Sequence, residues 1–152
     1  MILDRYEIKA GNNLTTFEFL SEGIKGQILK IIQFQQMNLE NLYNLAFGDK
    51  NLDTGKLDDT VVTDNGDSEK VLATVVSAIY AFADRYPDSW IYATGSTASR
   101  TRLYKMGINK YYEIVLEDFE IMGEYRNEWE RYEFGKNYQA FAVHRKNSKF
   151  GI

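Results

Sequence analysis

DSEKVLATVVSAIYAFADRYPDSWIYA, residues 67–93, decides the fold because it sets a long amphipathic segment in the middle of the chain. Residues 68–86 carry apolar side chains at helical spacing, namely Val71, Leu72, Val75, Val76, Ile79 and Ala83. Asp67 is a natural N-cap, and Pro87 follows the end of the pattern. The apolar stripe is broad, so we expect this helix to lie across a sheet.

Strand-like segments flank the helix on both sides. TFEFL (16–20) alternates, residues 27–37 form a longer run, and NLYNLAF (41–47) follows after a short polar break. Three consecutive strands with short connections predict an antiparallel meander. After the helix, WIYA (90–93) predicts a short buried strand.

The last third of the chain predicts a second helix and two more strands. The helix spans residues 97–106 and is expected to end at Gly107, a favourable residue beyond a helix C-terminus. Strands are expected at 112–122 and 138–145, separated by the charged aromatic loop 124–137. The order β-β-β-(β)-α-β-α-β-β predicts an α+β fold: a single mixed, largely antiparallel sheet with two main helices.

Composition narrows the class of protein. With 152 residues we expect a single domain over 1–152, and a net charge of −4 gives no global attraction for nucleic acid. The absence of cysteine excludes disulfides, thiolate metal sites and cysteine nucleophiles. MILDRYEIKAG has neither a basic start nor a long apolar run, so we expect a soluble cytoplasmic protein without signal peptide or membrane anchor.

The acidic segment GDKNLDTGKLDD invites comparison with a calcium loop. Oxygen-bearing side chains alternate at its start, as in an EF-hand, at Asp49, Asn51 and Asp53. The sixth position is Thr54 rather than glycine, and the twelfth is Thr60 rather than glutamate. A hairpin accounts for the same residues, with Asp-Thr-Gly as the turn and 56–63 returning beside 41–47. We therefore predict a hairpin and no metal site.

IYATGSTASRTRLYKMGI (91–108) is the candidate binding segment. A strand that turns into a helix presents free N–H groups at the positive end of the helix dipole, where an anion can bind. The candidate ligand-binding residues are Gly95, Ser96, Thr97, Arg100 and Tyr104. Arg102 lies about 200° round the helix from Arg100 and faces elsewhere. Plain capping of the helix is the alternative, since neither G-x-x-x-x-G-K-[ST] nor G-x-G-x-x-G occurs here.

Other polar and aromatic residues give weaker signals. His144 is the only histidine, so it cannot build a multi-histidine metal site, and no serine nucleophile motif accompanies it. Glu128, Glu130 and Glu133 are expected on a solvated strand or loop face. Several aromatic residues either line a partner surface or cover the edge of the sheet, namely Tyr125, Trp129, Tyr132, Phe134 and Tyr138.

Long stretches of the chain resemble an uncharacterised family of small proteins found mainly in Bacteroidetes. These stretches are NLYNLAFGD, DNGDSEKVLATVVSAIYAF, YPDSWIYATGSTASRTRLYKMGI and GKNYQAFAVHRK, and together they cover most of the sequence. The resemblance implies a bacterial protein, and it implies no activity because the family has none established.

The order of elements is also similar to the core of the acyl-CoA N-acyltransferase superfamily. The helix motif of that superfamily, (N/S)xxARxLYxxxGF, resembles SRTRLYKMGI at Arg100, Leu103, Tyr104, Gly107 and Ile108. The resemblance implies a general-acid role for Tyr104. Such enzymes cradle coenzyme A pyrophosphate with a [R/Q]-x-x-G-x-[G/A] turn before the long helix. This chain has the acidic DNGDSEK (64–70) there, whose aspartates repel a pyrophosphate.

These observations lead to a ranked set of functional hypotheses. The first is a non-enzymatic domain, without cofactor, that binds a protein partner or a small phosphate-containing anion. The second is a divergent acyl-CoA N-acyltransferase-like enzyme that uses Tyr104. The third is a toxin–antitoxin-like or phage-defence component acting through protein contacts.

Overall fold

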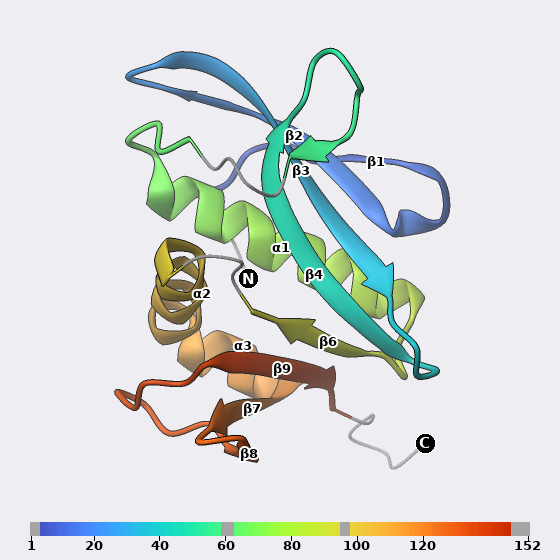
Figure 1. Ribbon diagram of the computed structural model, residues 1–152, viewed down its shortest axis with the longest axis vertical. Coiled ribbons are helices and arrows are strands. Elements are labelled where there is room, and N and C mark those ends of the chain that lie inside the picture. The colour runs from blue at the N-terminus through green and yellow to red at the C-terminus, as the bar shows by residue number, and fades with distance from the viewer. Residues whose placement is uncertain (1–3, 59–62, 95–97, 147–152) are drawn as a thin grey trace.

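The computed structural model describes residues 4–58, 63–94 and 98–146, with side chains left undescribed at 12 and 98–100. In these ranges a mixed sheet carries three helices on one face (Figure 1). The strands are β1 (Lys9–Ala10), β2 (Thr16–Gly23), β3 (Gly26–Gln36), β4 (Leu42–Lys50), β5 (Leu57–Asp58), β6 (Trp90–Ala93), β7 (Phe119–Tyr125), β8 (Glu128–Arg131) and β9 (Ala140–Arg145). The helices are the 3₁₀ turn η1 (Asn12–Leu14), α1 (Ser68–Arg85), α2 (Ala98–Lys110) and α3 (Tyr112–Asp118). The α+β prediction is confirmed.

The sheet has the order β1-β2-β3-β4-β6-β9-β7-β8, and β5 pairs with β4 off this path. The predicted meander is confirmed, because β2–β3 and β3–β4 are antiparallel pairs. Among the described pairs only β4–β6 is parallel, and it extends from Leu42↔Trp90 to Asn44↔Tyr92. A parallel pair needs a crossover connection, which α1 supplies.

Helix α1 lies across the sheet as its apolar stripe predicts (Figure 1). Its buried side chains pack on the β-strand core, and Phe82 stacks on Phe34 of β3 with ring centroids 4.2 Å apart. Asp67 occupies the N-cap position, but its side chain makes no capping hydrogen bond. Its carboxylate instead accepts hydrogen bonds from Tyr6 and Ser21, so the expected cap is replaced by a tertiary contact.

Helix α2 continues past the expected end at Gly107 and reaches Lys110. Gly107 lies inside the helix and faces α1. A Cβ atom added there would lie 3.0 Å from Cδ2 of Leu72. The prediction that this glycine ends the helix is therefore wrong, and its missing side chain allows α1 and α2 to approach closely.

The expected strand 112–122 is a short helix followed by a strand, so α3, with 7 residues, joins the two main helices α1 and α2. Ile114 and Val115 of α3 pack against the part of α1 that includes Leu72 and Val76. This tertiary contact overrides the β-like local composition of the segment.

The charged loop 124–137 contains a strand that the sequence analysis missed. Strand β8 pairs with β7 across a two-residue turn at Arg126 and Asn127, whose φ angles are 51° and 67°. Positive φ at both turn residues fits the type I′ hairpin, in which asparagine is favoured. The asparagine was the available signal for this hairpin.

Candidate functional site

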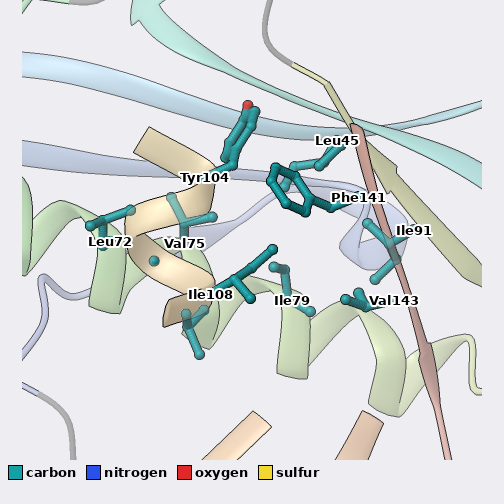
Figure 2. Close-up of a pocket in the computed structure, with 12 residues that line it drawn as sticks. Leu45, Leu72, Val75, Ile79, Ile91, Tyr104, Ile108, Phe141 and Val143 are labelled. Atoms are coloured by element: carbon teal, nitrogen blue, oxygen red, sulfur yellow. The ribbon is translucent and has the colours of Figure 1, made fainter. Parts of the chain in front are cut away.

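An apolar pocket of about 60 Å³ lies between α1, α2 and the sheet (Figure 2). The helices contribute Leu72, Val75, Val76, Ile79, Tyr104, Gly107 and Ile108. The strands contribute Leu45, Ile91, Ala93, Phe141 and Val143. The lining is aliphatic and aromatic throughout, so the pocket suits an apolar group rather than a charge.

The pocket follows from the way β4 and β6 part from each other. Their pairing ends at Asn44↔Tyr92, and Leu45 and Ala93 are the next residues along each strand. Strand alternation turns Leu45, Ile91 and Ala93 toward the helices. Gly107 lies opposite on α2, and the small side chains at both walls leave the space unfilled.

Tyr104 is the one predicted site residue that the structure places in this pocket. Its side chain is 6% exposed, and its hydroxyl oxygen lies at the end of the ring farthest from α2 (Figure 2). Gly95, Ser96 and Thr97 lie outside the described residues, as does the side chain of Arg100. The anion-binding role of that segment therefore stays a prediction.

A second group of polar residues surrounds the start of α1. The Asp67 carboxylate accepts hydrogen bonds from the Tyr6 hydroxyl at 2.5 Å and from Ser21 Oγ at 2.6 Å. Burial raises the pKa of Tyr6, and its hydrogen bond to Asp67 raises the pKa further. Asn65 is buried beside them and donates to Ser21 Oγ at 3.1 Å. Asn65 O lies so close to the β2–β3 hairpin that a Cβ added to Gly23 would meet it at 2.0 Å.

This packing bears directly on phosphate binding at α1. The helix start is joined to the β2–β3 hairpin through Asn65 and Asp67, and Asp67 keeps its carboxylate at the positive end of the helix dipole. Glu69 adds a second carboxylate in the first turn. The end of α1 where the acyltransferase resemblance places a pyrophosphate is thus occupied by the chain itself and carries negative charge.

The acidic segment forms the predicted hairpin, because β5 pairs with β4 at Asp49↔Asp58 and Lys50↔Leu57. Asp49 forms an ion pair with buried Lys30 at 2.6 Å, and Asn51 Oδ1 accepts the N–H groups of Asp53 and Thr54 within the turn. These oxygens are therefore committed to the fold. Thr60 lies outside the described residues, and no metal-binding cluster of three or more His, Cys, Asp or Glu occurs within the described ones.

Of the remaining polar candidates, His144 and Glu130 contact other side chains of the fold. His144 stacks on Trp90 with ring centroids 4.7 Å apart. Glu130 accepts hydrogen bonds from Lys136 and Tyr138, and these bonds lower the pKa of Glu130. Glu128 and Glu133 are exposed, as expected.

The aromatic residues of segment 124–137 and Tyr138 divide into two groups. Tyr132 and Tyr138 are buried in the core, so they line no partner surface, and burial raises the pKa of Tyr132 to about 12. Trp129 and Phe134 are exposed, and Tyr125 is half-buried. The surface interpretation therefore applies to the exposed pair, and Trp129 lies on the edge strand β8.

The fold and the pocket together define a small α+β protein in which a crossover helix and an apolar pocket lie on one face of an open sheet. The chain belongs to a family of unknown function, DUF6934, whose profile matches residues 3–146. No curated protein and no solved structure matches the chain. No helix within the described residues is long and apolar enough to cross a membrane.

Proposed function

We propose that this chain is a binding domain for a small ligand that places a short apolar group in the pocket and an anionic group at the start of α2. The observation that carries the proposal is the pocket itself, which is lined only by apolar side chains and the ring of Tyr104. Tyr104, Gly107 and Ile108 belong to α2, whose first turn includes Arg100 of the predicted anion-binding residues. Arg100 and Tyr104 are four residues apart, about 6 Å along the helix axis, so the long arginine side chain would bring the two ends within reach of one small ligand.

The volume of the pocket limits the apolar group. Cavities of about 150 Å³ lined by Leu, Ile and Phe bind benzene, which corresponds to about 25 Å³ per carbon. A pocket of about 60 Å³ therefore has room for about two or three carbons. Each buried methylene contributes about 0.8 kcal/mol, so affinity should rise about fourfold per added carbon until the pocket is full.

The anionic part of the proposal is supported by the chemistry of helix N-termini. Free N–H groups and the dipole at the start of α2 favour a carboxylate or phosphate. Gly95, Ser96, Thr97 and Arg100 are the residues that we propose to hold it. The acidic start of α1 would repel the same group, which directs the ligand toward α2.

A nuclear magnetic resonance titration with acetate, propionate, butyrate and octanoate tests this function, with inorganic phosphate as a separate arm. Methyl signals of Val75, Ile108 and Val143 should shift saturably, with affinity rising from acetate to butyrate and falling for octanoate. Ala93→Leu fills the pocket and should abolish the chain-length trend. The matched control, Ala46→Leu, adds the same bulk on the opposite face of β4 and should leave the trend unchanged.

The same titration separates the two ends of the ligand. Arg100→Ala should weaken butyrate and phosphate binding by a similar factor and preserve the dependence on chain length. Equal affinity for acetate and butyrate would contradict the pocket, whereas identical anion binding in wild type and Arg100→Ala would contradict the proposed anion site.

A divergent acyl-CoA N-acyltransferase is the second candidate. The order of elements favours it, because the long helix α1, the strand β6 and the helix α2 with Tyr104 follow one another as the resemblance implies. The carboxylate at the start of α1 argues against it. Calorimetric titration with acetyl-CoA distinguishes the two candidates. Saturable binding that perturbs residues 66–72 supports the enzyme, and no binding at millimolar acetyl-CoA rejects it.

A further inference from the structure

Both tryptophans of the chain lie on the face of the sheet opposite the three described helices. Strand alternation turns Ile91 and Ala93 of β6 toward the pocket and therefore turns Trp90 and Tyr92 away from it. Register places His144 of β9 beside Trp90. Trp129 of β8 reaches Tyr92, and we call these four residues the aromatic face: Trp90, Tyr92, Trp129 and His144.

The aromatic face forms two ring pairs. Trp90 and His144 are stacked with centroids 4.7 Å apart, and Tyr92 and Trp129 meet edge to face at 5.8 Å. Strands β9 and β7 both lie between β6 and β8, and β9 carries the small residues Ala140 and Ala142 on this face, which leaves room for the rings of Tyr92 and Trp129 to meet. Trp129 nevertheless stays 42% exposed. The large ring is thus held in place while part of its surface is open to a partner.

Carboxylates border the aromatic face. Glu120 pairs in register with His144, and Glu124 pairs with Trp129. Burial raises the pKa of Tyr92, and the nearby negative charge of Glu124 raises this pKa further. The Glu124 carboxylate is therefore close enough to place negative charge beside the aromatic face. Among the described residues neither glutamate forms an ion pair. Arg131 is the basic residue of these strands on this face, opposite Met122.

We propose that the aromatic face docks an arginine- or lysine-rich segment of a protein partner. Tryptophan and tyrosine rings attract cations through their π faces, and guanidinium groups bind carboxylates with two hydrogen bonds. Trp and Tyr also dominate binding energy at protein interfaces. A cationic partner is complementary to Glu120 and Glu124 and to the net charge of −4. The two glutamates and the net negative charge repel the phosphates of a nucleic acid.

Tryptophan fluorescence reports on this face directly, because no tryptophan lies elsewhere in the chain. The experiment titrates the full chain with capped hexa-arginine, capped hexa-glutamate and the neutral oligosaccharide maltohexaose. Hexa-arginine should change the emission saturably, with an affinity that falls as salt is added, and the other two probes should not. A response to maltohexaose with none to hexa-arginine would assign the face to carbohydrate and overturn the proposal.

Matched variants separate a specific contact from general attraction by the net charge. The double variant Glu120→Gln/Glu124→Gln should weaken hexa-arginine binding about fivefold or more. Trp129→Leu should weaken it about fivefold, and calorimetry measures this variant because it has lost one of the two fluorophores. Glu113→Gln/Glu117→Gln changes the net charge equally at exposed positions of α3 and should have a much smaller effect. If both double glutamate variants lost the same affinity for hexa-arginine, the attraction would come from the net charge alone, and the docking face would be contradicted. Circular dichroism checks that each variant is folded.

Discussion

Lys30 of β3 is a basic residue with only 1% of its surface exposed, and it lies on the face of the sheet that the helices cover. Its ammonium group donates to Asp49 Oδ1 at 2.6 Å and to the carbonyl of Thr63 at 2.8 Å. Thr63 Oγ1 in turn donates to Asp49 Oδ2 at 2.5 Å. A buried charge is tolerated only when it is paired and hydrogen-bonded, so this triad ties the chain entering α1 to β3 and β4.

Asp49→Leu should therefore lower the free energy of unfolding by about 3–5 kcal/mol, because it leaves a buried ammonium without its counter-charge. Adding Lys30→Met to this variant removes the orphaned charge and should restore part of the loss, as urea denaturation would measure. The partly exposed pair Glu18–Lys50 is the control, and Glu18→Gln should cost less than about 1 kcal/mol. A double variant no more stable than Asp49→Leu alone would contradict the role assigned to the ion pair.

At the scale of elements, glycines set how closely segments approach. Gly107 allows α2 to approach α1, and Gly123 of β7 allows the ring of Tyr138 to lie against the strand. A Cβ added to Gly123 would lie 2.4 Å from Cδ1 of Tyr138. The ring cannot move aside freely, since its hydroxyl donates to Glu130 at 2.9 Å and accepts from the N–H of Glu133 at 2.9 Å.

Gly123→Ala is accordingly expected to lower the free energy of unfolding by about 2–3 kcal/mol through overpacking. Gly11→Ala is the matched control, because the nearest atom to an added Cβ there is 3.4 Å away and its φ is −83°. Chemical denaturation compares the two. Similar stabilities for both variants would show that the segment from β8 to β9 yields easily and that the contact with Tyr138 is not rigid.

At the scale of the whole molecule, α1 joins the two halves of the sheet. The β4–β6 seam has only three register pairs, so few backbone bonds cross it. Phe82 of α1 stacks on Phe34 in the first half, and Tyr80 meets Phe119 of the second half edge to face at 5.1 Å. One hydrophobic cluster contains residues of both halves, which predicts a single cooperative unit.

Urea unfolding followed by two probes tests the single-domain prediction. Both tryptophans report on the second half of the sheet, whereas far-ultraviolet circular dichroism reports on all described elements. The two transitions should coincide in midpoint and slope. A fluorescence transition that precedes the circular dichroism transition would show that β6–β9 unfold independently.

Local sequence patterns predict an element correctly when its buried side chains recur at a single spacing along its whole length. The apolar stripe of α1 and the alternation in β2 and β3 predicted their type and most of their extent. The strand prediction for residues 112–122 is wrong for its first part, because residues 112–118 form a helix that packs against α1. The strand β7 begins only at Phe119. The candidate site was predictable only in part: the sequence indicates Tyr104, which lines the pocket, but the pocket draws on residues from five elements that no local pattern brings together.

The sequence by itself determined the α+β class, the long helix that lies across the sheet and the segment 91–108 that contributes to the pocket, because these depend on periodicity and turn chemistry along the chain. Only the tertiary structure decided which face of each strand is covered. WIYA looks uniformly buried in sequence, yet Ile91 and Ala93 line the pocket while Trp90 and Tyr92 lie on the aromatic face. The reason is physical: the described helices cover one face of the sheet, and a single strand carries no information about where distant helices pack.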